Sequence, residues 1–418
     1  MTLSIEAIAN RDRYYQETAK ANGQNYYPGA AFTVSPANVQ KFIQDIQKDL
    51  AIMKKIKYRS VPQRSSQTLS FGVTRGIHSR GNTTNHNAAD NKQVNTYTTA
   101  ERKYRMLIPF ADIDTWQGYV RFVDEMKRLY KENYVHELLY IGMMGIDRHA
   151  DPESFYDSGN PWDYLQHVDR GWRVVLESLN ASNVITGWEV GTNVIIYGKD
   201  REIPLESVVA TSEAAGAKTG IPLAGHGFIT GGQIFVLGET GYDTVYIVQP
   251  ETTADKVVID KAYAATTFSA TASLKQKKDF SNVGSLVGKL KRKIPRVKRN
   301  GLECWLADDL AEANEFKILD SQNPATPSEQ GFISKMTASL GLMPTYEPAI
   351  MPASTIWVLN PSTLGIYELN GSRRREAKDD LDLSAQTDKT YYEADNVVED
   401  PDRFVVAENV HELEAYTP

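Results

Sequence analysis

The sequence has little cysteine and no long apolar run. Its single cysteine, Cys304, cannot form an internal disulfide, so nothing in the chain depends on an oxidising compartment. The N-terminus lacks the apolar segment of a signal peptide, and no run reaches the ~18 uninterrupted apolar residues of a membrane span. We therefore expect a soluble protein that has no membrane partner and that packs Cys304 in its core.

An excess of positive charge is missing as well. The 46 basic and 53 acidic residues give a net charge of -7, which argues against a protein whose whole surface grips nucleic acid. Any contact with a polyanion must then be local. The chain has 418 residues, of which 41% are hydrophobic and 24% are charged. These values are ordinary for a folded protein with two or three domains or one elaborated fold.

The motifs of metal and nucleotide sites are incomplete. HELLY at 136–140 and HELEA at 411–415 begin like the zinc motif H-E-x-x-H, but Tyr140 and Ala415 stand where the second histidine must lie. GAKT at 216–219 lacks the glycine that a phosphate loop needs immediately before its lysine. We therefore expect no catalytic residue, no bound metal and no cofactor.

A dense group of polar residues lies in NPWDYLQHVDRGW at 160–172. His167 follows Asp163 by four residues, which suits a charge relay or a metal ligand by residue type alone. Asn160 and Pro161, however, form the N-cap and first-turn pair that starts a helix, and the apolar residues that follow recur at helical spacing. We favour an amphipathic helix on which a solvated His167 pairs with Asp163. The alternative is a hydrolase that uses carboxylates with His149 or His167.

Two segments do not suit a compact domain. Residues 64–102 are rich in Ser, Thr, Asn and Gly and lack the apolar residues to build a core, so they are either disordered or a hairpin ordered by what it touches. We favour a hairpin that reaches a neighbouring molecule. Residues 112–145 carry an apolar stripe at the 3.6-residue period without a proline, which predicts one helix of roughly 50 Å that serves as a strut.

The remaining chain mixes strands and helices. Short Val- and Ile-rich runs separated by Gly, Asp and Pro predict a β-rich segment at about 180–278. Helical patterns follow at 279–294 and 301–316, and the tail is strand-like. Arg373 to Arg375 precede an acidic run at 379–382, which predicts an ion-pair network within or between subunits.

One run, at 289–299, is strongly basic. It could bind phosphates, but no aromatic residues interleave for base stacking, so a solvated or subunit-facing helix surface is favoured. The residues of this polyanion or subunit contact are Lys289, Lys291, Arg292, Lys293, Arg296, Lys298 and Arg299.

Six short motifs occur in an order that resembles one known family. They are FTVSPANVQ at 32–40, LSFGVTRGI at 69–77, ADIDTW at 111–116, IGMMG at 141–145, NP with LQ and GW between 160 and 172, and YELNGSRRR at 367–375 followed by VVED at 397. The sequence thereby resembles the major capsid proteins of P-two-type tailed bacteriophages, which have the Hong Kong 97-type capsid fold. The motif residues to which the resemblance gives a structural role are Phe32, Pro36, Gly72, Trp116, Gly145, Asn160, Pro161, Gln166, Gly171, Trp172, Arg374 and Arg375.

The chain departs from the family pattern in two places. His167 stands where family members have an aspartate, in a stretch with two extra residues after the N-P pair. The β-rich stretch at about 180–278 is longer than anything the family pattern supplies there.

The resemblance implies an α+β fold with five parts. These are an N-terminal arm and first helix (1–63), an extended β-hairpin loop (64–108), a spine helix with the peripheral domain (109–165), an axial domain (166–385) that includes the extra β-rich insertion, and a C-terminal strand returning to the peripheral domain (386–418).

The resemblance also implies a structural function without catalysis. Such a protein assembles with itself into the hexamers and pentamers of an icosahedral head around double-stranded DNA. Its partners would be the scaffolding protein and protease, the portal, decoration proteins and, by weak contact, the packaged DNA. It would reside in the virion capsid after assembly in the bacterial cytoplasm. A phage protease trims the arm in this family, and the matching position lies at Ala31 and Phe32.

Overall fold

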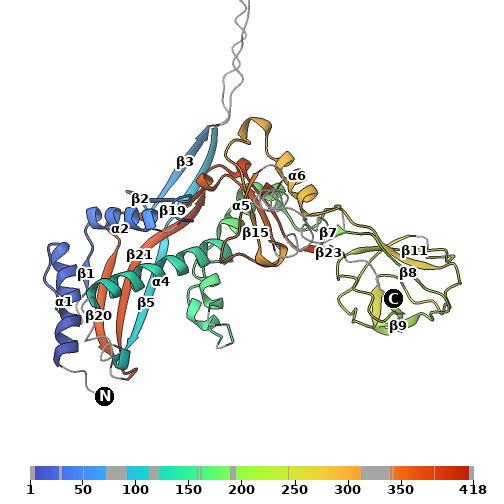
Figure 1. Ribbon diagram of the computed structural model, residues 1–418, viewed down its shortest axis with the longest axis horizontal. Coiled ribbons are helices and arrows are strands. Elements are labelled where there is room, and N and C mark those ends of the chain that lie inside the picture. Colours follow the sequence, from blue (N-terminus) through green and yellow to red (C-terminus); the bar gives the residue numbers. More distant parts are fainter. Residues whose placement is uncertain are drawn as a thin grey trace, which may run out of the picture. The chain divides into compact units, whose positions relative to one another are not determined.

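The computed structural model divides the chain into two compact units. It describes residues 5–27, 31–49, 51–71, 92–112, 122–157, 159–160, 162–188, 194–242, 244–311, 339–340, 343–380 and 382–413. Unit 1 comprises Met1–Leu179 and Pro361–Pro401, and unit 2 comprises Asn180–Asn360 and Asp402–Pro418. Both units mix helices and strands (Figure 1), so the α+β class is confirmed.

Unit 1 is built on one six-stranded sheet. The strand order is β1-β20-β21-β19-β2, and β5 pairs with β21 as well. The strands are β1 (Phe32–Thr33), β2 (Lys57–Val61), β5 (Ala100–Pro109), β19 (Leu364–Leu369), β20 (Arg374–Asp380) and β21 (Ala385–Val398). β21 is the longest of them and pairs with β5 from Ala385 to Ala394. It therefore ties the C-terminal third of the chain to the N-terminal third.

Helices cover the sheet of unit 1. They are α1 (Ile5–Ala21), α2 (Pro36–Asp49), α4 (Phe122–Met144) and α5 (Trp172–Asn180), with short 3-10 turns η1 (Pro152–Phe155), η2 (Asp163–His167) and η6 (Pro361–Thr363). A further turn, η7 (Pro401–Arg403), lies where the chain passes from unit 1 to unit 2. α4 turns a buried stripe toward the sheet, in which Tyr130 and Tyr134 meet Tyr104 of β5 edge to face at 5.3 and 5.4 Å. Figure 1 shows α4 lying across β21 and β5.

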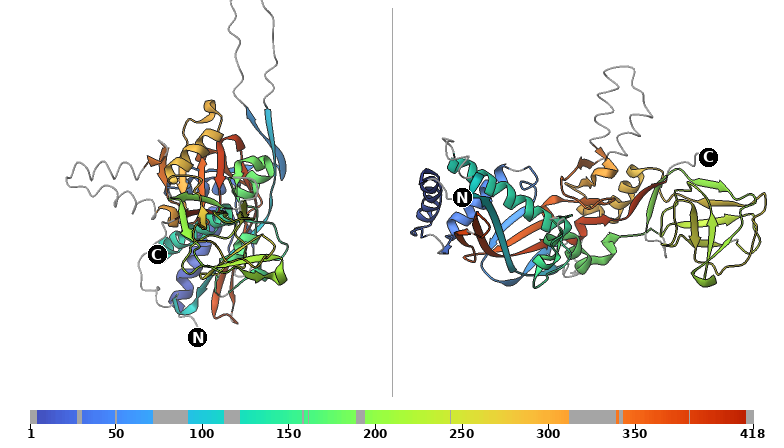
Figure 2. Two further views of the ribbon diagram at one scale, coloured as in Figure 1. Left: turned by 90° about the vertical axis from the view of Figure 1, so that its right-hand side faces the viewer. Right: turned by 90° about the horizontal axis from the view of Figure 1, so that it is seen from below.

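A two-stranded ribbon extends from this sheet. β3 (Ser65–Phe71) pairs antiparallel with β4 (Lys92–Thr98), from Ser65 opposite Thr98 to Phe71 opposite Lys92. The two strands lie side by side in Figure 2. The hairpin spans fewer residues than the predicted 64–108, because residues 100–109 form β5 and belong to the main sheet.

Unit 2 contains a first core around a six-stranded sheet in the order β16-β17-β15-β18-β22-β6. α6 (Val283–Lys293) contributes Leu286, Val287 and Leu290 to the same core, and Cys304 lies within it as expected. The elements of this core are β6 (Val184–Ile185), β15 (Glu303–Leu306), β16 (Ser339–Leu340), β17 (Met343–Tyr346), β18 (Ile356–Leu359), β22 (Phe404–Ala407), η3 (Ala181–Asn183) and η5 (Arg296–Lys298). A parallel pair, β7 (Ile195–Gly198) and β23 (Val410–Leu413), follows.

A second, all-β core lies within the predicted β-rich segment. Two sheets, β13-β10-β9 and β12-β11-β14-β8, enclose it. Their strands are β8 (Arg201–Pro204), β9 (Thr211–Glu213), β10 (Lys218–Pro222), β11 (Gln233–Leu237), β12 (Val245–Ile247), β13 (Lys256–Ile259) and β14 (Ser273–Gln276), with η4 (Ala214–Gly216) between β9 and β10. Fifteen buried residues, Phe228 and Tyr242 among them, form a cluster of their own. This module, residues 201–276, therefore has its own hydrophobic core.

Three sequence predictions are wrong in detail. The helix expected over 160–172 is a single turn, η2, and the chain leaves helical geometry before α5 begins at Trp172. The helical pattern at 301–316 begins with a buried strand, β15. The C-terminal segment 386–418 is divided, because β21 lies in unit 1 and β22 lies in unit 2.

The expected boundaries of the other segments also differ. Residues 361–385 group with unit 1 and not with the rest of 166–385. Of the strut helix predicted at 112–145, the structure describes 122–144 as helical, and residues 113–121 lie outside the described part of the chain.

Candidate assembly elements

Side chains of β21 and its surroundings hold the root of the β3–β4 hairpin. The buried Asn95 donates hydrogen bonds from Nδ2 to the carbonyl oxygens of Val398 and Glu399 at 3.1 and 3.0 Å. Arg64 donates to both oxygens of Glu393 at 2.7 and 2.9 Å. Tyr97 packs edge to face on a tyrosine of β19 at 5.2 Å. The hairpin is therefore fixed at its base, by both polar and apolar contacts.

Behind this root lies a buried network of two arginines and two aspartates. Arg102 and Asp169 are almost fully buried and form an ion pair. Arg148 donates to Asp169 from Nε and to Asp395 from Nη2, the latter at 2.5 Å. Asp395 also accepts the backbone N–H of Thr98 at 2.9 Å. Burial, and then the nearby carboxylate of Asp169, raise the pKa of Asp395 to about 6. The network joins β5, the segment after α4, β21 and the hairpin root.

The glycines of IGMMG and GW allow two backbones to touch. Gly171 donates its N–H to the carbonyl of Gly145 at 3.0 Å. A Cβ on Gly145 would lie 2.6 Å from the nitrogen of Gly171, and one on Gly142 would lie 2.6 Å from the ring of Trp172. Trp172 is fully buried and donates from Nε1 to the carbonyl of Gly365 at 3.0 Å. These motif residues therefore fix the start of α5 against the end of α4.

Arg373 lies in a cage of rings under α2 and α4. It donates to both oxygens of Glu368 at 2.9 Å each and to the hydroxyl of Tyr134 at 2.6 Å. Its guanidinium also stands over the rings of Phe42 and Tyr134 at 4.9 Å. Burial raises the pKa of the Tyr134 hydroxyl well above its ordinary value. Arg373 thus joins the loop between β19 and β20 to α4.

Arg375 forms a third buried ion pair, with Asp388 of β21. Its Nε donates to the two carboxylate oxygens at 2.9 and 3.2 Å, and its guanidinium stands over the ring of Tyr130 at 4.3 Å. Within the chain, Arg373 and Arg375 pair with Glu368 and Asp388 and not with the acidic run at 379–382, whereas a network between subunits stays a prediction. Alternate residues of a strand face opposite sides. Arg375 points inward to Asp388, whereas Arg374 is exposed.

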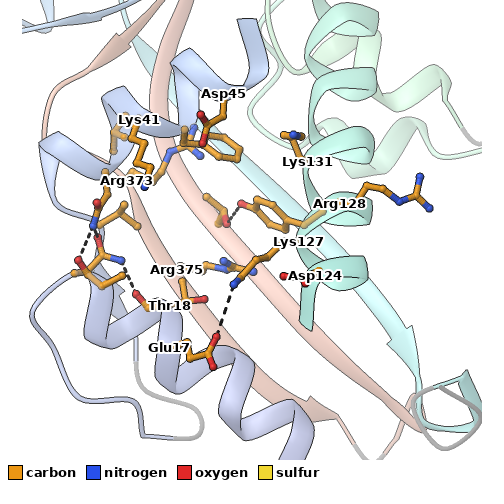
Figure 3. Close-up of a pocket in the computed structure, with 18 residues that line it drawn as sticks. Glu17, Thr18, Lys41, Asp45, Asp124, Lys127, Arg128, Lys131, Arg373 and Arg375 are labelled. Carbon is orange, nitrogen blue, oxygen red and sulfur yellow. Dashed lines mark hydrogen bonds and ion pairs between the residues drawn. The ribbon is translucent and has the colours of Figure 1, made fainter. Parts of the chain in front are cut away.

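The N-terminal helix α1 lies beside Arg375, as Figure 3 shows. Tyr15 of α1 is fully buried and donates its hydroxyl to Asp388 at 3.2 Å. α1, α2 and α4 border a cleft of about 480 Å³ that Arg373 and Arg375 help to line. The family resemblance implied only an N-terminal arm here. Tyr15 and Ala19, one helical turn apart and both buried, are the signal that could have identified a packed helix.

The predicted cleavage position lies between α1 and the sheet. Ala31 is exposed, and the next residue, Phe32, is buried in β1 opposite Arg375. Pro36 opens α2, and Ser35 before it accepts the N–H of Asn38 at 3.4 Å.

The other motif residues have local roles or lie outside the described part of the chain. Gln166 donates to Asp163 at 3.1 Å and to Tyr140 at 3.4 Å, and Asn160 also donates to Asp163. Gly72, Trp116 and Pro161 are not among the described residues.

His167 does not pair with Asp163. Its Nδ1 lies 2.9 Å from Asp147, in the segment after α4, because η2 folds back on that segment. Among the described residues, no group of three His, Cys, Asp or Glu side chains could hold a metal ion. Within that same part of the chain, no helix is long and apolar enough to span a membrane.

The basic run at 289–299 is largely engaged within unit 2. Lys298 is buried and pairs with Asp402 at 2.9 Å, and Arg299 donates to the carbonyls of Ile294 and Arg292 at the end of α6. Lys293 donates to the carbonyl of Ser182, and Lys289 stands over the Trp188 ring. The exposed arginines of the run are Arg292 and Arg296.

Comparison of the fold with solved structures identifies phage capsids. The structure of the satellite phage P4 procapsid including size determination (Sid) protein is similar over 98% of this chain and 99% of that chain, with a TM-score of 0.62 at 16% sequence identity. The capsid of an empty GTA particle has a TM-score of 0.38 at 8% identity over 86% and 90% of the two chains. The mature capsid of bacteriophage PhiM1 has a TM-score of 0.36 at 8% identity over 88% of each chain. A search of curated proteins found no match.

The sequence itself matches the model of one protein family, described as phage major capsid protein, P2 family. The match covers residues 11–210 and 247–410. The departure from the family is therefore 211–246, inside the all-β module, and is shorter than the 180–278 predicted. The chain belongs to the P2 family of phage major capsid proteins, and its role is to build a capsid.

Proposed function

We propose that the protein assembles into hexamers and pentamers of an icosahedral head of Hong Kong 97 type around double-stranded DNA, and that it does so without catalysis. The observation that carries this proposal is the hairpin. Asn95, Arg64 and Tyr97 anchor it at its root, yet Ser65, Gln67, Thr96 and Thr98 are exposed. A ribbon that its own chain holds at one end is suited to lie on a neighbouring subunit, where an obligate interface of roughly 2,000 Å² or more would order it.

A truncation of the hairpin tests this proposal. Residues 72–91 are replaced by a short Gly-Ser turn, and the variant is expressed beside the wild type with the scaffolding protein and protease of the same phage. The variant should give folded subunits that form no closed shells in the electron microscope. Normal shells from the truncated chain would contradict the proposal.

The N-terminal segment is proposed to be the part removed during maturation. Cleavage between Ala31 and Phe32 is supported by the exposure of Ala31 next to the buried β1 residue Phe32. It would detach α1, and with it Tyr15, from the Arg375–Asp388 pair. Intact mass on mature particles should show a chain that starts at Phe32. Retention of residues 1–31 in infectious particles would contradict it.

The all-β module is proposed to lie on the outer surface, as a decoration or a contact between capsomers. Its separate core supports this, as does the interruption of the family match at 211–246. Deletion of 211–246 would cut the sheets of the module, so the whole stretch 201–276 is removed instead. The deletion should leave assembly possible and lower the stability of the shell. Loss of all folding would show that the module is essential to unit 2.

A further inference from the structure

The segment after α4 exposes a group of large apolar side chains. Among the described residues, eleven large hydrophobic side chains are exposed, and four of them lie within residues 146–162. Their exposed fractions are 51% for Ile146, 39% for Phe155, 61% for Tyr156 and 40% for Trp162. We call these four residues the aromatic patch. A concentration of exposed apolar side chains in one short segment is typical of a binding surface.

Neighbouring side chains hold the aromatic patch in place. Phe155 stacks on His167 at 3.8 Å between ring centroids, and Trp162 lies 4.9 Å from the ring of His136. His167 is in turn held by Asp147. The backbone at Ile146 is fixed as well, because its N–H donates to the carbonyl of Gln166 at 2.7 Å. Since the rings are already ordered, a partner would lose little conformational entropy in binding them.

The surroundings of the aromatic patch are acidic. Asp147, Asp151, Glu153 and Asp157 are exposed in the same segment. The arginine of this segment, Arg148, is engaged by the two buried aspartates of the network described above. A surface that combines aromatic rings with exposed carboxylates selects an arginine-rich partner, because one guanidinium can stack on a ring and also pair with a carboxylate.

Unit 2 presents a surface of that chemistry. Arg292 and Arg296 are exposed, and neither has an ion-pair partner among the described residues. Val297, between Arg296 and the buried Lys298, is 64% exposed. The turn is rigid, since Arg299 donates to two carbonyls at the end of α6 and Lys298 pairs with Asp402. We call Arg292, Arg296 and Val297 the basic turn.

We infer that the aromatic patch of one subunit binds the basic turn of a second copy of this chain. The inference rests on the proposed assembly, and it names a contact within it. The arginines pair with Glu153 and Asp157 and stack on the rings, and Val297 covers apolar surface. Because the two surfaces differ, the contact is head to tail, which is the type that closes into rings.

Other basic side chains fit less well as the partner. Lys103 and Arg105 line a cleft of about 790 Å³ together with Glu153 and Tyr156 of the same unit. Lys103 also pairs with Glu101 at 3.3 Å. These cations are therefore neighbours of the acidic segment within one molecule, and they flank the aromatic patch but do not complete it.

A charge exchange tests the contact. One variant carries Arg292→Glu and Arg296→Glu, a second carries Glu153→Arg and Asp157→Arg, and a third carries all four changes. Each one-sided variant should lower the yield of shells by at least about tenfold, and the fourfold variant should recover most of it, because the charges again oppose one another. Lys199→Glu, an exposed change elsewhere in unit 2, is the control and should assemble as the wild type does. Circular dichroism verifies that all subunits are folded.

A cross-link provides a readout that does not need complete shells. Trp162→Cys and Arg296→Cys are combined in one chain and treated with a short bismaleimide, and the native Cys304 is buried and should not react. A ladder of covalent multimers is expected from the double variant and not from either single variant. Normal assembly of the one-sided charge variants, or the absence of a ladder from folded double-cysteine subunits, would overturn the inference. Failure of the wild type to assemble would instead overturn the proposed function.

Discussion

The buried network at the hairpin root makes a quantitative prediction for Asp169. Its carboxylate is fully buried and accepts hydrogen bonds from Arg102, from Arg148 and from the backbone N–H of Arg170, the last at 2.8 Å. Asp169→Asn replaces one acceptor oxygen by an NH₂ group that faces cationic donors, and it leaves a buried arginine without its charge partner.

Breaking a buried ion pair from one side costs about 3–5 kcal/mol. At about 1.4 kcal/mol per factor of ten, the unfolding equilibrium constant of unit 1 should rise by roughly 100-fold to several thousand-fold. Urea denaturation of dispersed subunits, followed by tryptophan fluorescence, measures this change because Trp172 lies beside the network. The matched control is Glu125→Gln, which breaks an exposed pair with Arg128 on α4.

The control should leave the urea midpoint of the wild type unchanged, because solvent screens both partners. Asp169→Asn should shift the first transition to clearly lower urea. A midpoint for Asp169→Asn within error of the control would refute the reasoning that this network holds the hairpin root and the start of α5 together.

Three further predictions concern single residues of the same framework. Gly145→Ala should prevent folding, because the added Cβ would lie 2.6 Å from the backbone nitrogen of Gly171. Gly288→Ala in α6 places its Cβ in open space and should stabilise the fold by about 0.5–1 kcal/mol. Soluble yield and urea midpoints compare the two variants. Glu137→Gln should raise the free energy of unfolding by about 1–3 kcal/mol at pH 8 and change it little at pH 4.5. Burial raises the pKa of Glu137 to about 7, so the folded protein holds this side chain protonated at low pH, and that contribution to stability is lost as pH rises through about 7. Equal gains at both pH values would contradict this. Asn95→Ala removes two hydrogen bonds and should destabilise the hairpin root by about 2–3 kcal/mol, so the amides of the root should exchange faster with solvent. Unchanged hydrogen-exchange protection of residues 64–71 would argue that the apolar contacts alone hold the root.

Residue patterns in the sequence were sufficient to predict the elements that form from neighbouring residues. The polar composition of 64–102 indicated a hairpin without its own core, and the structure has β3 and β4 there. The apolar stripe of α4 was readable because its residues face one sheet along their whole described length. The β-rich segment was recognised from its Val and Ile runs, although the strand pairing within it could not be read.

Features that depend on distant residues were not predictable in this way. Arg102 and Asp169 are 67 positions apart, so nothing in either neighbourhood indicates a buried ion pair. That pair draws Asp169 inward, and the contact between Gly171 and Gly145 then interrupts the helix that the pattern of 160–172 indicates. The strand β15 was taken for a helix because a short apolar run with Glu and Ala next to it has no distinguishing period. The contact between His167 and Asp147 was not predictable either, because the fold, and not helical spacing, brings these two residues together.

The most direct test of capsid formation by this chain is a reconstruction of the particles it forms. The full chain, expressed with the scaffolding protein and protease of its own phage, is purified by sedimentation and examined by cryo-electron microscopy. The account predicts closed icosahedral shells built of pentamers and hexamers, in which the β3–β4 hairpin of each subunit lies on a neighbouring subunit. A protein that sediments as a 46.8 kDa monomer or a small oligomer under all these conditions would contradict it.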